Sequence, residues 1–576
     1  MQHRRTLPLL ATALAACTAT NAAVCYNQLS AAQFPNCAAL SPSVALHWAL
    51  NASHITFGVD ADVPSNALYW FAIGISEMGG MFGADVWMLT RVPGNQSYVM
   101  MDLFSTTTVR PVPDSEQDVF LLTPPPPSNI NTLFTFTRPI ETCDTSDYPI
   151  IQGRSHHMIW AYGQGDPTGV ALPHRPSDSD RGNAQIVLFP NSNASVELKE
   201  DVAVKELEES NNLLTFDARF PSTNLIPLRE TSYLCSNFQL PVYSKHHIVQ
   251  YEGIVDSSHL HHMVVFGCTS KPTNLGQVVD CASMQLDCSQ IMFMWAPGKG
   301  KTVLPIEAGY AIGPDQDSFE YITLQLHYNN QQRSSNIPDS SGFRIYYTSK
   351  LRANDVGTLT LGSRDIHIPG NSNDYTALKP NICPSECTSK FPHDLVVISN
   401  GFHMHTLGFN ASSRLVRQGQ EISPLGLRQY YNFGFQGNTL PADAQAVIKP
   451  GDAIITQCVY LPTAGLRSQP TTLGESTQDE MCYNFVTYYP ALKAIDTCIS
   501  SSKQNIAFCS LKQNVGLGIS VQAVQKGFLI PYASPSFVPY SPVCTPSAQV
   551  VVAPSQSDAV ILSQTFLLFA AMFLAA

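Results

Sequence analysis

The sequence predicts an all-β protein built from several sandwich domains, and three observations lead to this expectation. Long helical periodicity is scarce, whereas alternating runs such as YITLQLHY at 321–328 recur between Gly, Pro and Asn turns. The chain has 576 residues, several times the usual length of one domain. Hydrophobic residues make up 44% and aromatic residues 10%, which is enough to form packed cores. A series of β-sandwiches accounts for all three observations.

The composition points to a protein outside the cytosol. Charged residues make up 13% of the chain, about half the ordinary share of roughly 25%. The net charge of −12 argues against a nucleic-acid partner, because phosphates repel an acidic surface. Fifteen cysteines are more than a reducing cytosol usually leaves in one chain. We therefore expect a secreted or surface protein.

The N-terminal segment 1–23 has the pattern of a secretory signal peptide. Two arginines precede an apolar stretch over 7–16, and small residues at Ala22 and Ala23 suit cleavage. The apolar stretch is shorter than the roughly 20 residues of a membrane-spanning helix. Cleavage would remove Cys17 and leave fourteen cysteines, enough for seven bridges. Four Asn-x-Ser sequons are candidate glycosylation sites on this route: Asn51, Asn95, Asn193 and Asn410.

The C-terminal tail, 559–576, is apolar apart from Ser563 and Gln564, and no basic residue follows it. A spanning helix normally carries a cytoplasmic Lys or Arg. Small residues at 555–557, then a short spacer and an apolar end, favour a cleaved signal for a glycolipid (GPI) anchor. A tail-anchored helix and an unprocessed tail are the alternatives. The expected location is the secretory pathway and then the cell surface or the extracellular space.

Two further segments divide the interior of the chain. Residues 196–212 hold the densest charge cluster and are expected to be an exposed linker, with a solvated helix face as the alternative. Residues 513–558 are rich in Ser, Pro, Val and Gln, which is typical of a stalk.

Five histidines and one methionine are the candidate metal ligands. They are His261, His262, His327, His403, His405 and Met481. Side chains on a strand repeat every two residues, so His403 and His405 share one face. Adjacent histidines at 261 and 262 point to opposite faces of an ideal strand, so joint ligation requires a bend there. Imidazole suits copper and a thioether favours Cu(I), so a His₃ set and a His₂Met set would make two copper sites of different softness.

The segments around these ligands resemble the copper type II, ascorbate-dependent monooxygenases. HHMVVFGC, LQLHYNN, HMHT and EMCYNFVTYYP occur in this order, with supporting matches at 231–235, 245–253 and 294–300. The resemblance covers about 210–510. It implies two copper-binding β-sandwich (jelly-roll-like) domains, at 213–345 and 352–512.

The resemblance also implies a role for each ligand. His261, His262 and His327 would hold an electron-donating copper. His403, His405 and Met481 would hold the copper that binds O₂ and would form the catalytic set, because the soft sulfur favours Cu(I). Ascorbate would be the reductant. A further pair, His246 and His247, matches a strand of the family that carries no ligand, so we expect it to be structural.

The family pattern further implies a set of disulfides, although sequence alone cannot establish connectivity. The implied pairs are Cys235–Cys281, Cys268–Cys288, Cys383–Cys498 and Cys458–Cys482. The remaining cysteines would complete seven pairs as Cys387–Cys509, Cys143–Cys544 and Cys25–Cys37.

The N-terminal region, 40–195, resembles a DOMON domain, which implies another β-sandwich. The resemblance rests on segments 70–89, 136–150 and 158–163. Some DOMON relatives bind b-type haem between a Met and a His. Met81 and His174 stand at positions compatible with such haem ligands, and a haem-free domain is the alternative.

The expected function is the hydroxylation of a C–H bond of a small substrate with O₂ and ascorbate. Peptide-amidating members carry an Arg two residues before the His-x-His pair, whereas this chain has Gly401, so bidentate carboxylate recognition is lost. The segment 484–489 is closer to amine-hydroxylating members, yet 264–267 offers no carboxylate to a cationic amine. A phenolic amine is therefore one candidate substrate. The competing hypothesis is a non-catalytic copper or haem protein for binding or electron transfer at the cell surface, but all six ligands are present.

Overall fold

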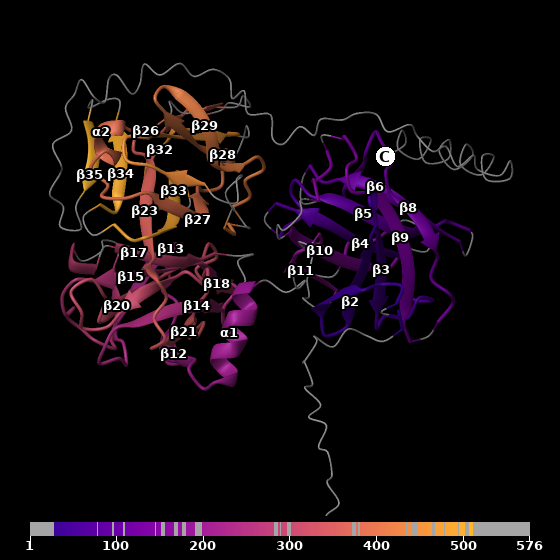
Figure 1. The fold of residues 1–576 in the computed structure, drawn as a ribbon, viewed down its shortest axis with the longest axis horizontal. Coiled ribbons are helices and arrows are strands. Elements are labelled where there is room, and N and C mark those ends of the chain that lie inside the picture. The colour runs from indigo at the N-terminus through magenta and orange to yellow at the C-terminus, as the bar shows by residue number, and fades with distance from the viewer. Residues whose placement is uncertain are drawn as a thin grey trace, which may run out of the picture. The chain divides into compact units, whose positions relative to one another are not determined.

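The computed structural model describes residues 28–510, apart from short gaps. These gaps are 31, 78, 95–96, 107–109, 129, 145, 151–155, 166–170, 175–179, 190–198, 282–285, 289, 297–300, 371–375, 378–380, 434–435, 439–445, 463–466, 477, 493–494 and 502–505. The described part is almost entirely strands, as Figure 1 shows. The all-β expectation is confirmed.

The first domain is a sandwich of two antiparallel sheets, ordered β1-β2-β3-β9-β8 and β11-β10-β4-β5-β6-β7. Its strands are β1 (Asn36–Ser41), β2 (Val44–Leu50), β3 (His54–Ala61), β4 (Trp70–Ser76), β5 (Asp85–Arg91), β6 (Tyr98–Phe104), β7 (Val112–Pro113), β8 (Phe120–Thr123), β9 (Thr132–Pro139), β10 (His156–Gly163) and β11 (Arg181–Ile186). Alternate residues of the strands face inward, so Trp48, Phe57, Trp87 and Phe136 fill the core.

The helix α1 (Lys199–Glu209) precedes the second domain and lies within the charged linker. Two sheets follow, ordered β12-β21-β14-β19-β22, with β18 beside β14, and β16-β13-β20-β15-β17. The elements are β12 (Leu214–Arg219), β13 (Thr231–Gln239), β14 (His246–Ile254), β15 (Leu260–Cys268), β16 (Val278–Asp280), the 3₁₀ turn η1 (Leu286–Cys288), β17 (Gln290–Trp295), β18 (Thr302–Val303), β19 (Ala308–Ile312), β20 (Tyr321–Asn329), β21 (Gly342–Thr348) and β22 (Asn354–Asp355).

The third domain has one sheet ordered β30-β27-β33-β23-β34-β35 and one ordered β25-β31-β28-β29, with β26 beside β31 and a small β24-β32 pair. Its elements are β23 (Gly357–Ser363), β24 (His367–Ile368), β25 (Thr376–Ala377), β26 (Asn381–Cys383), α2 (Ser385–Thr388), β27 (Leu395–His403), β28 (Gly408–Arg417), β29 (Gln420–Arg428), β30 (Val447–Ile448), β31 (Ala453–Tyr460), β32 (Thr471–Thr472), β33 (Cys482–Tyr489), β34 (Thr497–Ser501) and β35 (Ile506–Ser510).

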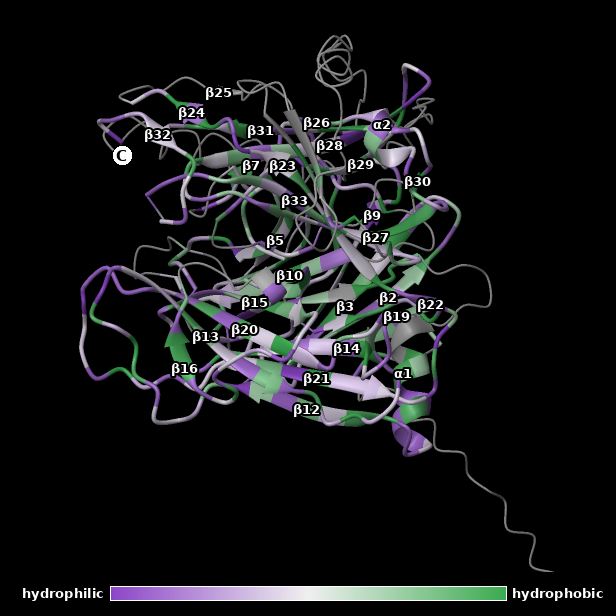
Figure 2. Ribbon diagram, turned by 90° about the vertical axis from the view of Figure 1, so that its left-hand side faces the viewer, coloured by the Kyte–Doolittle hydropathy of each residue, from purple (hydrophilic) through white to green (hydrophobic). Residues whose placement is uncertain are grey.

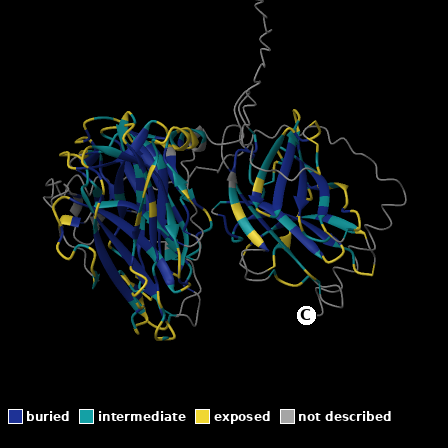
Figure 3. Cartoon of the chain, turned by 90° about the horizontal axis from the view of Figure 1, so that it is seen from below, coloured by how far each residue is buried: buried dark blue, intermediate teal, exposed yellow. Residues whose placement is uncertain are grey.

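Burial follows the strands. Hydrophobic and hydrophilic residues alternate along strands such as β12 and β21 (Figure 2). The buried residues lie in the strands, and the exposed ones gather in the connecting loops (Figure 3). The second domain has its own continuous apolar core, as the first has, which explains why each can hold its strands in a defined register.

Five disulfides brace the second and third domains. They are Cys235–Cys281, Cys268–Cys288, Cys383–Cys498, Cys387–Cys509 and Cys458–Cys482, and all five pairs were expected from the sequence. Cys37 and Cys143 are also disulfide-bonded. Their expected partners, Cys25 and Cys544, lie outside the described residues, so these two pairings stay predictions.

Several expectations fall outside the described residues. They concern the signal at 1–23, the stalk at 513–558, the tail at 559–576 and the sequons Asn95 and Asn193. Of the other two sequons, Asn51 is exposed and Asn410 is half-buried. Among the described residues, no helix combines the length and the apolar character needed to cross a membrane.

Candidate metal centre

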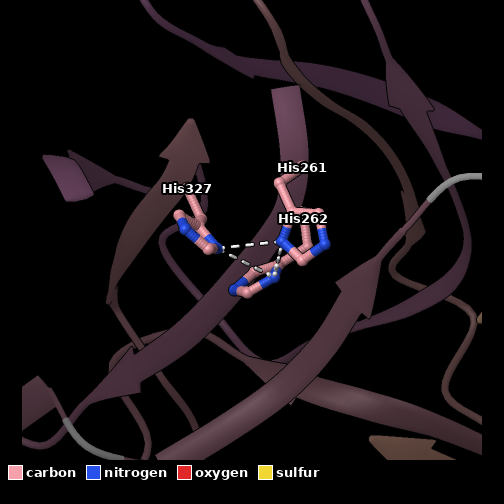
Figure 4. A group of neighbouring side chains, drawn as sticks. All are labelled: His261, His262 and His327. Atoms are coloured by element: carbon pink, nitrogen blue, oxygen red, sulfur yellow. Dashed lines mark hydrogen bonds between the residues drawn. The ribbon is translucent and has the colours of Figure 1, made fainter. Parts of the chain in front are cut away.

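A cluster of three histidines forms where β15 and β20 pair. His262 on β15 stands opposite His327 on β20 in the antiparallel register. The register shifts between Leu260 and His262, so His261 sits at an irregularity in the strand. This is the bend that two adjacent histidines need if both are to point to one side. The three imidazoles do point toward one another (Figure 4).

The Nδ1 atoms of these histidines converge on one point. The Nδ1–Nδ1 distances are 2.9 Å for His261–His327, 3.1 Å for His261–His262 and 3.4 Å for His262–His327. A point about 1.8 Å from all three nitrogens lies at the centre of that triangle, close to the roughly 2.0 Å of an imidazole–metal bond. Three lone pairs aimed at one point fit a metal ion.

Burial keeps these rings in the form that binds metal. It lowers the pKa of His261 to about 3 and that of His327 to about 2, and it also holds the pKa of His262 well below its usual range. Neutral imidazole is the ligand form, so no proton has to leave before a metal binds near neutral pH. Thr323, Gln325 and His327 share one face of β20, and all three side chains are buried.

Tyr233 supports the first cluster from the neighbouring strand β13. It stands opposite His327, and the two rings stack with centroids 4.2 Å apart and planes 13° apart. The Tyr233 hydroxyl donates to the Glu475 carbonyl at 2.7 Å. This contact ties the His327 strand to the segment that precedes Met481.

The second pair, His403 and His405, lies at the end of β27. His403 is the last residue of β27 and pairs with Tyr483 on β33, and Met481 directly precedes β33. The Tyr460 hydroxyl donates to the Met481 carbonyl at 2.7 Å. The disulfide Cys458–Cys482 braces the residue that follows Met481. The three predicted residues of the second set therefore meet at one end of the sheet.

The Nδ1 atoms of the second pair have protein partners. The Gln436 Oε1 lies 2.8 Å from His403 Nδ1, and the Asp479 carbonyl lies 2.9 Å from His405 Nδ1. These oxygens accept, so each Nδ1 carries the proton and each Nε2 keeps its lone pair. Burial lowers the pKa of His403 to about 3 and also lowers that of His405. The second pair can thus bind metal through Nε2, whereas the first cluster presents Nδ1.

Glu480 holds the backbone of the second set. Its side chain is fully buried and accepts the N–H groups of His405 and Leu407, both at 2.7 Å, and that of Met481 at 3.3 Å. Burial raises the pKa of Glu480 to about 7, while the three N–H donors oppose this rise. One carboxylate therefore joins the His-x-His turn to the methionine. Sequence reasoning missed it, although an acid directly before a buried ligand was a signal.

A segment that begins at Arg428, the last residue of β29, and runs to 438 brings three more side chains to the centre. The Tyr431 hydroxyl donates to the Met404 carbonyl at 2.5 Å and accepts its N–H at 3.0 Å, so it clamps the residue between the two histidines. The Phe433 ring stacks on His261 at 4.2 Å. Gln436 holds His403, as described above. No local pattern marks these residues, and only the folded structure identifies them.

The two clusters face each other. The rings of His262 and His403 have centroids 5.5 Å apart, and Phe433 lies 4.2 Å from His261 and 6.2 Å from His405. The described structure therefore brings both predicted ligand sets into one buried centre. His247 lies elsewhere and bonds to Asp355 at 2.9 Å and to the Arg352 N–H at 3.0 Å, a structural arrangement.

The proposed haem ligands lie in the first domain. Met81 precedes β5 and its carbonyl accepts the Ala84 N–H, while the His174 ring lies 6.5 Å from the Trp70 ring. Ala84 and Trp70 belong to one apolar cluster, which lies on the face of its sheet opposite the sandwich core. Met81 and His174 therefore both border that cluster.

Family models match most of the described chain. Residues 41–163 match the DOMON domain. Residues 216–335 match the N-terminal domain and residues 354–510 the C-terminal domain of copper type II ascorbate-dependent monooxygenases. Both ligand sets fall within the two matched copper domains.

Curated relatives resemble the chain over most of its length. Tyramine beta-hydroxylase of Caenorhabditis briggsae is 28% identical over 77% of this chain and 74% of its own length. Dopamine beta-hydroxylase of Rattus norvegicus is 29% identical over 81% of this chain and 74% of its own. DBH-like monooxygenase protein 1 of Homo sapiens is 28% identical over 78% of this chain and 71% of its own length. The similarity includes the DOMON domain as well as the copper domains.

Among solved structures, the cytochrome domain of Myriococcum thermophilum cellobiose dehydrogenase is 14% identical, with a TM-score of 0.20. The match covers 29% of this chain and 85% of the cytochrome domain's chain. This likeness is too distant to indicate a ligand.

Proposed function

Because the chain belongs to the copper type II ascorbate-dependent monooxygenases, we propose that each copper domain binds one copper ion. His261, His262 and His327 would hold the first ion, and His403, His405 and Met481 the second. The observation that carries this assignment is that three Nδ1 atoms converge in the first set, while the His403 ring of the second set faces His262 and Glu480 joins the backbones of His405 and Met481. The donor sets differ in softness, which suits two coppers with different tasks.

The bound copper would supply the one-electron steps and the activation of O₂. A substrate C–H bond, one O₂, two electrons from ascorbate and two protons give an alcohol and water. The protein would supply the geometry and a dry site. Phe433 covers His261, Tyr233 covers His327, and Gln436 keeps the proton of His403 on Nδ1.

The substrate is proposed to be a small aromatic compound rather than a peptide. Gly401 has no side chain, and an added Cβ would lie 3.5 Å from Phe485, an ordinary contact distance, so this position offers no guanidinium to a peptide carboxylate. The Phe485 ring lies 6.5 Å from His403 and 6.0 Å from Tyr483, which gives an aromatic lining beside the second site. Rings of this kind favour an aromatic partner over a carboxylate. Phenolic amines, named in two of the relatives, are therefore the first compounds to test.

The experiment combines metal analysis with turnover. Purified protein is reconstituted with copper, the copper per chain is measured, and ascorbate-dependent O₂ uptake is followed with tyramine, dopamine and a glycine-extended peptide. We expect two coppers per chain, and mass spectrometry should show the gain of one oxygen atom on an amine but not on the peptide. Fewer than two coppers, together with no turnover of any amine, would overturn the proposal in favour of a surface protein for copper binding or electron transfer.

The domain limits and the first domain's cofactor belong to the same proposal. We assign the DOMON domain to 40–195, the linker to 196–212 and the copper domains to 213–345 and 352–512. Met81 and His174 are proposed as haem ligands on the strength of their positions beside the apolar cluster at Trp70. Expression with added haem should give a Soret band, and its absence would withdraw this assignment.

The cellular location is proposed from the chain termini and the cysteines. The disulfides fit an oxidising compartment. We propose cleavage after the signal at 1–23, glycosylation at the sequons and retention at the surface through the 559–576 tail. Release of the protein from cells by a phosphatidylinositol-specific phospholipase would support a glycolipid anchor, and resistance would favour a spanning helix.

A further inference from the structure

The segment 428–438 contacts the copper centre with three side chains. Tyr431 clamps the Met404 peptide, Phe433 stacks on His261, and Gln436 holds His403 Nδ1. A displacement of this segment would therefore reach both ligand sets at once. The position of the segment depends on what holds its other side.

That other side is held by the DOMON domain. The Glu77 carboxylate, just after β4, accepts the N–H groups of Gln429 and Tyr430 at 3.3 and 3.4 Å. Strand β29 ends at Arg428, so these two peptides lie beyond its ladder. A carboxylate acceptor makes a stronger hydrogen bond than a neutral one, and here it fixes the direction in which the chain leaves the strand.

Aromatic contacts reinforce the Glu77 contact. The Tyr430 ring packs edge-on against Phe82 and Phe104, with centroids 5.4 and 5.7 Å apart. At Gly83, whose φ is +71°, an added Cβ would lie 2.5 Å from the Tyr430 ring. Only glycine permits both this backbone conformation and this close approach. The backbone at Gly83 thus leaves room for the Tyr430 ring.

Arg428 links this contact to the far end of the segment. Its guanidinium is fully buried and donates to the Gly437 carbonyl at 2.6 Å, which ties the two ends of the segment together. Burial lowers the pKa of Arg428, and the nearby Glu77 carboxylate raises it again. A buried guanidinium is costly without a nearby anion. Loss of Glu77 would therefore disturb Gly437, the neighbour of Gln436.

We propose that the DOMON domain is a positioning element for the copper centre, in which Glu77 fixes the segment 428–438 and, through it, His403 and His261. What the copper sites do rests on the proposed function, whereas the docking of Glu77 on the segment does not. Glu77 touches neither ligand set, so it is a positioning residue and not a catalytic one.

The test compares Glu77→Ala with Glu116→Ala, which removes an exposed glutamate of the same domain. Hydrogen exchange of peptides within 428–438 should become at least tenfold faster in the first variant only. Its copper-loaded form should show an altered Cu(II) electron paramagnetic resonance spectrum. Turnover should fall by roughly tenfold, the range of a lost outer contact at a metal site, with more O₂ consumed per product.

Tyr430→Ala removes the aromatic partner of the DOMON domain from the segment 428–438. Its control is Tyr243→Ala, because the Tyr243 side chain is 97% exposed. Tyr430→Ala should speed hydrogen exchange in 428–438 and alter the Cu(II) spectrum in the same direction as Glu77→Ala. This second variant decides the test if Glu77→Ala fails to fold. Unchanged exchange, or faster exchange with an unaltered spectrum and full turnover, would overturn the proposal. If the wild-type protein lacks turnover, the proposed function fails, but the exchange and spectroscopic readouts still decide this inference.

Discussion

The two histidine clusters are assembled by different means. In the first, strand pairing and one irregularity in β15 bring His261, His262 and His327 together, and their Nδ1 atoms lie within 3.4 Å of one another. In the second, each Nδ1 is engaged by another protein group, so Nε2 is the nitrogen that keeps its lone pair. The first cluster is built by backbone register and the second by a network of side chains.

The difference predicts different sensitivity to distant change. Register is cooperative over whole strands, so the first cluster should withstand changes in single surrounding side chains. The second depends on Glu480, Tyr431 and Gln436, which reach it from separate segments. Loss of the Glu480 contact, which does not involve the segment 428–438, should alter the second site and leave the first intact.

Met481→His should have the largest effect, because it replaces the donor that most distinguishes the two sites. A harder imidazole should still hold Cu(II), but the preference for Cu(I) should fall. We expect hydroxylation to drop by more than about a hundredfold, beyond the loss typical of an outer-shell contact. Copper per chain should stay near two. Hydroxylation at the wild-type rate would remove Met481 from the oxygen site, and with it the division of labour between the two sites.

His327→Ala should affect the first histidine cluster rather than the second. Removing one of three converging nitrogens should reduce copper to about one per chain and slow the electron supply. The spectrum of the second site should keep its wild-type form. Equal loss of copper from both sites would show that the clusters are not independent. Metal analysis and stopped-flow reoxidation provide the measurements.

Glu480→Gln tests the network around the second site. The amide keeps the size of the side chain but loses the charge that holds three N–H groups. Turnover should fall about 10- to 100-fold, as for other outer contacts of metal ligands. X-ray absorption should show a weaker copper–sulfur contribution, and the first site should stay unchanged. Glu475→Gln, five residues earlier and exposed, is the matched control and should behave as wild type.

Asp102→Asn should have the smallest effect in this series, because it should leave turnover unchanged. Burial raises the pKa of Asp102 above its usual range, and the nearby carboxylates of Asp85 and Asp147 raise it further. Between the unfolded and the folded pKa, the folded state retains a proton that the unfolded state has released. Stability therefore falls as pH rises through this range.

The asparagine cannot ionise, so this loss should disappear. The melting temperature of the DOMON domain within the full chain should exceed that of wild type by a few degrees at pH 8 and match it near pH 4. An equal pH slope in the two proteins would show that Asp102 does not carry the effect. Calorimetry across this range provides the measurement.

Much of the centre could be predicted from local sequence. The spacing in HMHT predicted that His403 and His405 lie together, and their ring centroids are 5.3 Å apart, although β27 ends at His403 and His405 follows it. The pairing Cys458–Cys482, which the family resemblance implies, is present beside Met481. Glu480 was predictable in part, since an acid beside a buried ligand needs partners. Phe433 and Gln436 were not, because they lie in a loop with no periodic pattern and reach the centre only through long-range contacts.

The sequence by itself determined the all-β class, the order of the domains and the identity of the six candidate ligands. These follow from alternation, composition and short motifs, which are local properties of the chain. Only the tertiary structure decided which ring nitrogens converge in the first cluster, that one carboxylate joins His405 to Met481, and that Glu77 of the DOMON domain contacts the segment beside both clusters. The physical reason is that a hydrogen-bond partner is set by position in space, and residues 352 positions apart, such as Glu77 and Gln429, meet only when the whole chain has folded.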